Sequence, residues 1–88
     1  MAIYYATCHT PDNNDADRRI QGLGGAGWWD NIDNIIRCID YGHVFFTDPP
    51  NGLRRKIITA VRNEKRYLKT EADGVEPNNI LALPRCAR

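Results

Sequence analysis

RRIQGLGGAGWWDN, residues 18–31, is the stretch on which the fold assignment of this chain depends. Gly22, Gly24 and Gly27 have the spacing G-x-G-x-x-G, which is typical of dinucleotide binding when it joins a buried strand to a helix. Here charged and polar residues precede the first glycine, and two tryptophans and Asp30 separate the last glycine from the helix that follows. The negative charge of Asp30 would also repel a pyrophosphate. We therefore interpret the glycines as a turn that requires positive φ or close backbone approach.

An amphipathic helix follows the tryptophans. Asp30 is expected to cap its N-terminus, since aspartate is a favourable N-cap. Isoleucines recur at the i, i+3, i+4, i+7 spacing, which places an apolar stripe on one face of the helix. Gly42 is expected to end the helix in a left-handed conformation. The residues of the stripe are Ile32, Ile35, Ile36 and Ile39.

Short strands are predicted on both sides of this helix. AIYYATCH, residues 2–9, is expected to form the first strand, and RRIQGL, residues 18–23, to pair back on it, with GGAG, residues 24–27, as a flexible corner. HVFFT, residues 43–47, is a further apolar strand. It ends at DPPNG, residues 48–52, because two consecutive prolines cannot continue a paired strand.

The basic segment, residues 54–69, allows two interpretations. Leu53, Ile57 and Val61 are four residues apart, as on one face of a helix, but the β-branched residues of this segment favour a strand. With a turn at Asn63–Glu64, apolar and charged residues separate onto opposite faces, so we predict a hairpin. One face then carries Ile57, Thr59, Val61 and Leu68, and the other carries Lys56, Arg62, Lys65 and Lys69 around Tyr67.

The C-terminal segment is expected to contain a turn at Asp73–Gly74 and a single helical turn, capped by Asn79, that ends before Pro84. The predicted order is strand, strand, helix, strand, strand, strand. Because 88 residues allow one modest core, we expect a single domain, residues 1–88. Its fold class is α+β, with a mostly antiparallel sheet and one amphipathic helix packed on one face.

The composition indicates a soluble cytoplasmic protein. No apolar run approaches the roughly 20 residues needed to span a membrane, and the N-terminal stretch lacks the basic and apolar pattern of a secretory signal. The three cysteines are odd in number and form no C-x-x-C pair, so we expect reduced thiols. Cys8 and His9 are neighbours on a predicted strand and point to opposite faces, which disfavours a zinc site.

The stretch YLKTEADGVEPNNILALPRC, residues 67–86, resembles the closing segment of a family of small bacterial domains of unknown function. The glycine-rich stretch with its tryptophans, followed by an isoleucine-rich helix, resembles the same family. The resemblance implies a compact stand-alone domain and carries no activity over to this chain. The C-terminal residues that carry it are Tyr67, Leu68, Thr70, Asp73, Asn79, Ile80, Leu81, Leu83, Pro84 and Cys86.

The glycine corner is the first candidate binding site. Backbone amides of a glycine-rich turn can hold an anion, neighbouring arginines would neutralise its charge, and a tryptophan could stack on a planar ligand. A tryptophan in such a place is more often a core anchor. The candidate ligand-binding residues are Arg18, Arg19, Gly24, Gly25 and Trp28. We therefore predict a small binding or accessory module that captures a small anionic, nucleotide-like ligand or a protein partner.

Nucleic-acid binding through the basic segment is the alternative function. The segment holds seven Lys or Arg residues against one acidic residue, and cations around an aromatic ring suit phosphate contact and base stacking. A solvated strand face has the same composition. The six acidic residues between positions 12 and 40 would oppose nucleic acid unless they lie on another side. The candidate residues are Lys56, Arg62, Lys65, Tyr67 and Lys69.

Catalytic, metal and cofactor sites are not expected. The chain contains no serine, and the side chains of Cys8 and His9 diverge on a strand, so no nucleophile–base pair is supported. Asp12, Asp15 and Asp17 lack the glycine and the glutamate of a calcium-binding loop. We expect no enzyme. If neither ligand class binds, a protein partner or a homo-oligomer is the remaining alternative.

Overall fold

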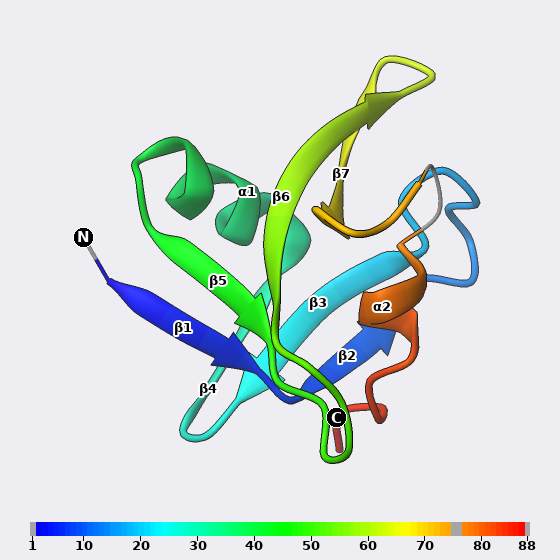
Figure 1. Ribbon diagram of the computed structural model, residues 1–88. Coiled ribbons are helices and arrows are strands. Elements are labelled where there is room, and N and C mark those ends of the chain that lie inside the picture. Colours follow the sequence, from blue (N-terminus) through cyan, green and yellow to red (C-terminus); the bar gives the residue numbers. More distant parts are fainter. Residues whose placement is uncertain (1, 75–76, 88) are drawn as a thin grey trace.

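Strands and two helices enclose one core in the computed structural model, which describes residues 2–74 and 77–87 (Figure 1). In chain order the elements are β1 (Ile3–Ala6), β2 (Cys8–Pro11), β3 (Ile20–Gly25), β4 (Trp28–Asn31), α1 (Ile32–Asp40), β5 (Val44–Thr47), β6 (Arg55–Arg62), β7 (Lys65–Thr70) and α2 (Asn78–Leu81). Neither of these two helices is long and apolar enough to cross a membrane.

The strands form two sheets. One sheet has the order β1-β5-β6-β7, and the other has the order β2-β3-β4. β1 and β5 run parallel, whereas the other paired strands of the two sheets are antiparallel. The prediction of a mostly antiparallel α+β domain is therefore confirmed. The division into two sheets, one of them mixed, is a long-range feature that the alternation of side chains does not reveal.

The predicted first strand, residues 2–9, is divided at Thr7. β1 belongs to the four-stranded sheet and β2 to the three-stranded sheet. The N–H of Thr7 donates to the carbonyl oxygen of Gly24 at 2.8 Å, on the β3 side, and the carbonyl of Ala6 accepts from Asp48 at 2.8 Å, next to β5. The chain thus crosses between sheets while it stays extended. The side-chain alternation continues through the crossing, which is why one strand was expected.

The glycine-rich stretch forms a hairpin. Gly24 and Gly25 lie in β3 and pair with Trp29 and Trp28 of β4, and Gly27 has a φ of +78° in the connecting turn. The expectation of a flexible corner at residues 24–27 is therefore wrong for the first two glycines. The tryptophan rings pack against their backbone and, together with Cys8 Sγ and the carbonyl oxygen of Tyr5, leave no space for a Cβ atom.

α1 places its isoleucine stripe in the core, as predicted. The buried residues of this helix are Ile32, Ile35 and Ile36. Gly42 has a φ of +97° just after the helix. The N-cap is Asn31 rather than Asp30, since Asn31 Oδ1 accepts a hydrogen bond from the N–H of Asn34 at 2.9 Å. The carboxylate of Asp30 accepts from the side chain of Asn34 and supports the same turn.

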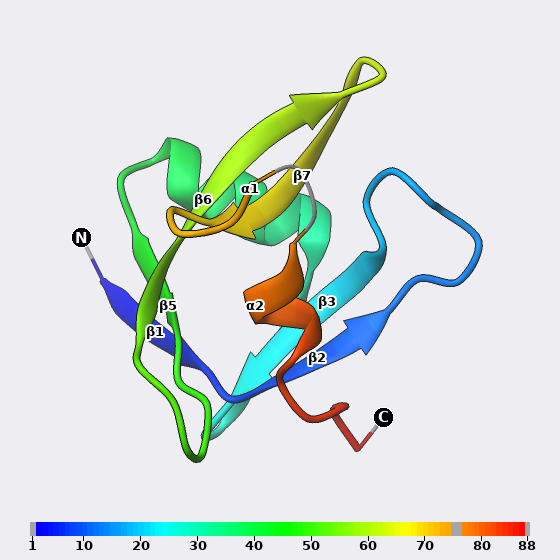
Figure 2. The same ribbon diagram turned by 45° about the vertical axis from the view of Figure 1, so that its right-hand side comes forward.

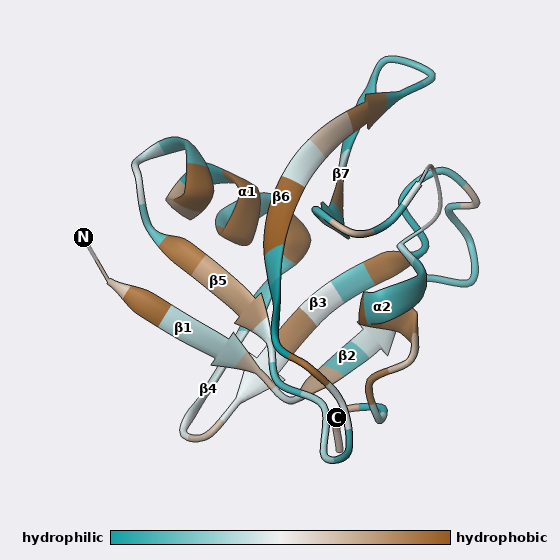
Figure 3. Cartoon of the chain, in the orientation of Figure 1, coloured by the Kyte–Doolittle hydropathy of each residue, from teal (hydrophilic) through white to brown (hydrophobic). Residues whose placement is uncertain are grey.

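The core lies between the two sheets. α1 packs against β3 and β7, and α2 packs against β2 and β7 (Figure 2). The apolar parts of α1 and of the strands are clear in the hydropathy colouring (Figure 3). The buried apolar residues are Ala6, Ile20, Leu23, Ile32, Ile35, Ile36, Phe45, Ile57, Leu68, Ile80 and Leu83. Ile80 of α2 is fully buried, so α2 also anchors the chain that follows it.

β6 and β7 form the predicted hairpin, and both turn residues, Asn63 and Glu64, have positive φ. Two exposures differ from the prediction: Val61 is 67% exposed, whereas Tyr67 is 4% exposed. The end of the hairpin extends beyond the core. Side chains there are exposed even on the face that is buried nearer the middle of β6. On the other strand, the loop of residues 12–19 lies along β7 and hydrogen-bonds to its backbone.

Cys8 and Cys86 form a disulfide with a Cα–Cα distance of 4.9 Å, and Cys38 is free. The expectation of reduced thiols is therefore wrong for two of the three cysteines. The two partners are 78 residues apart in the sequence. They meet because His9 and Arg85 form a parallel bridge between β2 and the segment after α2. Such a pairing has no local spacing that could predict it.

Candidate functional site

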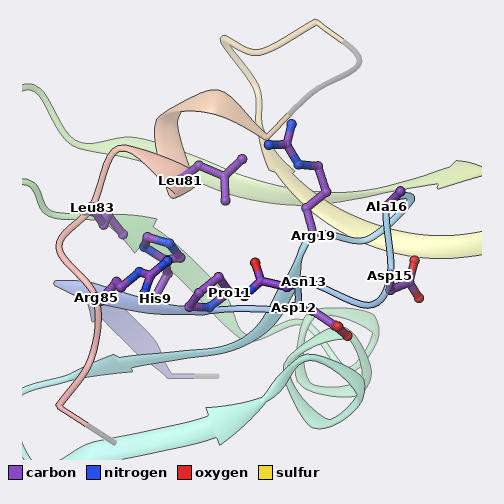
Figure 4. Close-up of a pocket in the computed structure, with 10 residues that line it drawn as sticks. All are labelled: His9, Pro11, Asp12, Asn13, Asp15, Ala16, Arg19, Leu81, Leu83 and Arg85. Atoms are coloured by element: carbon purple, nitrogen blue, oxygen red, sulfur yellow. The ribbon is translucent and has the colours of Figure 1, made fainter.

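A pocket of about 560 Å³ opens between β2, the loop of residues 12–19, α2 and the segment that follows α2 (Figure 4). Its basic groups are His9, Arg19 and Arg85, and Leu81 and Leu83 line it with apolar surface. This volume is in the range found for sites of small organic ligands. Because the lining groups come from separate segments of the chain, the pocket depends on the tertiary fold.

His9 forms the buried side of this pocket, with 5% of its surface exposed. The backbone N–H of His9 donates to the carbonyl of Pro84 at 2.9 Å, and the backbone carbonyl of His9 accepts from the N–H of Cys86 at 2.8 Å. These two bonds hold the segment after α2 against β2. Within the part of the chain that the structure describes, the buried Nδ1 of His9 has no hydrogen-bond partner. A buried ring nitrogen without a partner is uncommon and calls for an explanation.

Burial lowers the pKa of His9, because the imidazolium would lose its hydration. Hydrogen bonds with the backbone of Leu83 and Pro84 act in the opposite direction, and the positive charge of Arg85 lowers the pKa further. An imidazole whose pKa lies below its usual value is neutral at pH 7. The site therefore combines a neutral ring with two guanidinium groups.

Arg19 has a left-handed backbone, with a φ of +61°. Its N–H donates to the carbonyl of Asp15 at 2.8 Å, and its carbonyl accepts from the N–H of Asp12 at 3.0 Å, so both peptide groups close the loop. A left-handed conformation costs a residue other than glycine about 1–3 kcal/mol. Figure 4 shows the Arg19 side chain extending from the end of the loop toward α2, along one side of the pocket.

Two carboxylates also line the pocket, but donors of the loop already occupy them. Asp12 accepts from the N–H of Asn14 at 3.0 Å. Asp15 accepts from the N–H groups of residues 17 and 18 at 3.0 Å and from Lys65 Nζ at 3.3 Å. The hydrogen bond from the Arg18 backbone is the main cause that lowers the pKa of Asp15. In Figure 4 both carboxylates lie on the side away from His9.

The structure does not bring the five predicted ligand-binding residues together. Arg18 and Arg19 precede β3, whereas Gly24, Gly25 and Trp28 lie at its other end. Six residues of strand span about 20 Å. Arg19 lines the pocket described above. Arg18 is directed elsewhere.

Arg18 links the 12–19 loop to α1 and β7. Its guanidinium donates to Asp33 at 2.6 Å and to the carbonyl of Arg66 at 2.8 Å. Its side chain is 20% exposed, so much of its surface is used for these contacts. The Arg18 guanidinium therefore holds the loop against α1 and β7.

The glycine corner is closely packed. A Cβ atom on Gly24 would lie 2.9 Å from Cys8 Sγ, and one on Gly25 would collide with the carbonyl oxygen of Tyr5. The Trp28 ring packs edge-on against Tyr4, with centroids 5.7 Å apart. The interpretation of the glycines as positions of close approach is therefore supported. Gly24 and Trp28 do line a separate shallow hollow, whose volume is about 450 Å³.

Several cations of the basic segment form ion pairs with acidic residues. Its ion pairs are Arg54–Asp48 (3.1 Å), Arg62–Asp17 (3.8 Å), Lys65–Asp15 (3.3 Å) and Arg66–Asp40 (2.6 Å). Lys69 donates to the carbonyls of Asp73 and Gly74, and Lys56 is exposed. Tyr67 is buried and presents no open ring face for a base. Three of these four acidic partners, Asp15, Asp17 and Asp40, come from positions 12–40, and their place beside the cations weakens the case for nucleic acid.

Thr70, Asp73 and Asn79 form a hydrogen-bonded network between β7 and α2. Asp73 accepts from the N–H and Oγ1 of Thr70 at 3.0 and 3.1 Å, and from the N–H of Asn79 at 3.2 Å. Asn79 Nδ2 also donates to Thr70 Oγ1 at 2.9 Å. The expectation that Asn79 caps the helix is wrong, since Pro77 is the N-cap and Asn79 lies inside α2. The network positions α2 and hence one wall of the pocket.

His9 and Arg85 were not expected to bind a ligand. The sequence presents His9 only as a potential zinc ligand or catalytic base, and Arg85 only as an isolated charge near the C-terminus. One signal could have found them. If Cys8 is paired with Cys86, the neighbouring positions 9 and 85 must also lie close together.

Comparison with known proteins identifies a family and no function. The model of a family described as a protein of unknown function (DUF3892) matches residues 2–84. Cys86, which contributes to the resemblance noted in the sequence, lies just beyond this match. No curated protein and no solved structure matches the chain.

Proposed function

This chain belongs to the DUF3892 family of proteins of unknown function, and we propose that it is a binding module whose pocket at His9, Arg19 and Arg85 holds a small anionic ligand. The observation that carries the proposal is the pocket itself. Two guanidinium groups and a buried neutral imidazole line it, while the two nearby carboxylates are bound by the loop that carries them.

The chemistry of these groups indicates the class of ligand. Guanidinium groups bind carboxylates and phosphates through paired, charge-assisted hydrogen bonds. Leu81 and Leu83 offer apolar contact to the uncharged part of a ligand. A small metabolite with one or two phosphate or carboxylate groups, nucleotides included, combines these features. We propose no catalytic step and no cofactor.

This proposal keeps the ligand class predicted from the sequence and moves its site. Arg19 is the residue that the two share. Protein partners and homo-oligomers are secondary proposals. A bacterial origin and a cytoplasmic location stay predictions, the second of which must accommodate the Cys8–Cys86 disulfide.

Thermal shift and calorimetry with inorganic pyrophosphate, citrate and adenosine monophosphate test the proposal at low ionic strength. A ligand that binds the folded state raises the Tm by an amount that increases with the ratio of the free ligand concentration to its Kd. We expect at least one of these anions to raise the Tm of the wild type, and Arg19→Gln and Arg85→Gln to abolish the shift. Arg37→Gln, which removes an exposed arginine of α1, is the matched control and is expected to bind like the wild type.

Two results would contradict this function. One is that none of the three anions binds. The other is that both pocket variants bind as well as Arg37→Gln. Mixed oligonucleotides separate the alternative: binding that weakens steeply with salt and is lost in Lys65→Gln and Lys69→Gln would favour the basic segment.

A further inference from the structure

The disulfide joins the two segments that carry His9 and Arg85, two of the three basic groups of the pocket. Cys8 precedes His9 on β2, and Cys86 follows Arg85 on the segment after α2. His9 and Arg85 are paired across the same two segments. Besides the disulfide, two backbone hydrogen bonds, from His9 to Pro84 and from Cys86 to His9, connect them.

The two sulfur atoms face a hollow that is distinct from the anion pocket. Cys8 and Cys86 are each half-buried and line the hollow of about 450 Å³ together with Gly24, Trp28 and Trp29. Neighbouring side chains of a strand point to opposite faces. His9 therefore lies in one pocket and Cys8 in the other. A thiol can enter the second hollow without displacing a ligand from the first.

We propose that the Cys8–Cys86 disulfide is a thiol-exchange site for small thiols and dithiols, and that its opening weakens anion binding in the neighbouring pocket. Thiol exchange at the disulfide does not depend on the proposed function. The weakening of anion binding rests on it. The indole rings of Trp28 and Trp29 and the absence of a side chain on Gly24 shape the approach to the sulfur atoms.

The attacking thiols supply the two electrons that reduce the disulfide. A thiolate attacks one sulfur, the S–S bond breaks, and the other sulfur leaves as a thiolate that takes up a proton. A second thiol group resolves the mixed disulfide. Overall, two thiols are oxidised to a disulfide, and Cys8 and Cys86 are reduced to thiols. No further oxidant or reductant is needed.

Opening the disulfide changes the pocket because the described chain beyond the buried Leu83 is then held to β2 by the hydrogen bonds from His9 to Pro84 and from Cys86 to His9. The ends of a chain fray unless they are tied down. When residues 84–87 move away from β2, Arg85 leaves the pocket and the imidazole of His9 becomes hydrated. The basic groups that surround the anion are then no longer held together. Reduction is thus expected to lower affinity while the core stays folded, since Ile80 remains buried upstream.

The experiment measures thiol accessibility and anion binding on the same protein. Native wild type is treated with dithiothreitol or reduced glutathione, alkylated and weighed by mass spectrometry, and pyrophosphate affinity is measured before and after reduction. We expect two additional alkylated cysteines and an affinity lower by about tenfold or more, the loss that follows from one missing charge-assisted contact. Reoxidation is expected to restore the affinity. Cys38→Ser is the control and is expected to respond like the wild type.

Each outcome decides one half of the proposal. A disulfide that resists both thiols until the protein is denatured overturns the exchange site. Reduction with unchanged pyrophosphate affinity, or with loss of the far-UV circular dichroism of the whole domain, overturns the local coupling. If pyrophosphate, citrate and adenosine monophosphate bind neither redox state, the proposed function and the coupling fail, while the alkylation result still decides the exchange site. Cys8→Ser with Cys86→Ser provides a permanently open form for comparison.

Discussion

His9 and Arg19 each occupy a state that folded chains usually avoid. One is a buried imidazole whose Nδ1 lacks a partner among the described residues, and the other is an arginine with a left-handed backbone. Unfavourable states of this kind gather at functional sites, where the surrounding structure stabilises them. Both residues line the same pocket, so the two unfavourable states occur at one site.

The lowered pKa of His9 predicts a dependence of stability on pH. The unfolded state takes up a proton near pH 6.5, whereas the folded state resists it until a lower pH. The contribution of His9 to stability is therefore fully present above about pH 6.5 and is lost as the pH falls through the folded pKa. We expect urea midpoints of the wild type to decrease between pH 7 and pH 5.5, and His9→Gln to flatten this decrease.

His43→Gln is the matched histidine control for this measurement. It leaves His9 in place, so the decrease between pH 7 and pH 5.5 should persist. If His9→Gln shows the same slope as the wild type, His9 is not the group that titrates.

Replacing Arg19 by glycine separates backbone strain from ligand binding. Glycine adopts positive φ without the steric cost that arginine has here, but it also gains freedom in the unfolded chain. We expect Arg19→Gly to change the free energy of unfolding by less than about 1 kcal/mol and to abolish the Tm shift by the anion that binds. Urea titrations and thermal shift measure the two effects.

Gly27→Ala is the converse substitution, because φ at Gly27 is +78° and nothing lies within 4 Å of the added Cβ. It should destabilise by about 1 kcal/mol without affecting the anion. A large loss of stability in Arg19→Gly would mean that the arginine side chain holds the loop together and that its binding role is secondary.

At the scale of elements, the pocket depends on α2, a helix of four residues. A helix this short is not stable by itself. Its position is set by burial of Ile80 in the core and by the network of Thr70, Asp73 and Asn79. Four residues of the C-terminal resemblance thus hold one wall of the pocket in place: Thr70, Asp73, Asn79 and Ile80.

Asp73→Ala is expected to destabilise the domain by about 2 kcal/mol or more, because it leaves partly buried donors on Thr70 and Asn79 without their acceptor. Urea denaturation measures the loss. Glu71→Ala, an exposed carboxylate of the same turn region, should lie within about 0.5 kcal/mol of the wild type. Similar stabilities for the two variants would mean that the network contributes little to the position of α2.

At the scale of the molecule, the sequence predicted what depends on neighbouring residues. The isoleucine stripe of α1 and the turn at Asn63–Glu64 follow from local periodicity and turn chemistry, and both are confirmed. The crossing at Thr7, the two sheets and the Cys8–Cys86 disulfide join distant segments and leave no local pattern.

The candidate site likewise depends on contacts between distant segments, which the sequence does not reveal. Arg19 was predicted, but its grouping with Gly24 and Trp28 assumed that a glycine-rich turn would gather them, whereas β3 holds them at opposite ends. Burial of Tyr67 was also missed. The alternation of side chains along a strand tells which face a residue lies on, but not whether another segment packs against that face. The net charge of +1, with cations and acids interleaved, leaves little long-range attraction for anions. Under the proposed function, anion selectivity is therefore expected from short-range contacts in the pocket.

The cross-link between residues 8 and 86 makes a covalent ring of nearly the whole polypeptide. A protease that cuts once inside the ring, for instance at the exposed residues 50–53, produces two fragments that remain attached. Such a nicked molecule keeps its mass, apart from one added water, until a reductant separates the pieces. Electrophoresis with and without reductant would therefore report the redox state of the molecule directly.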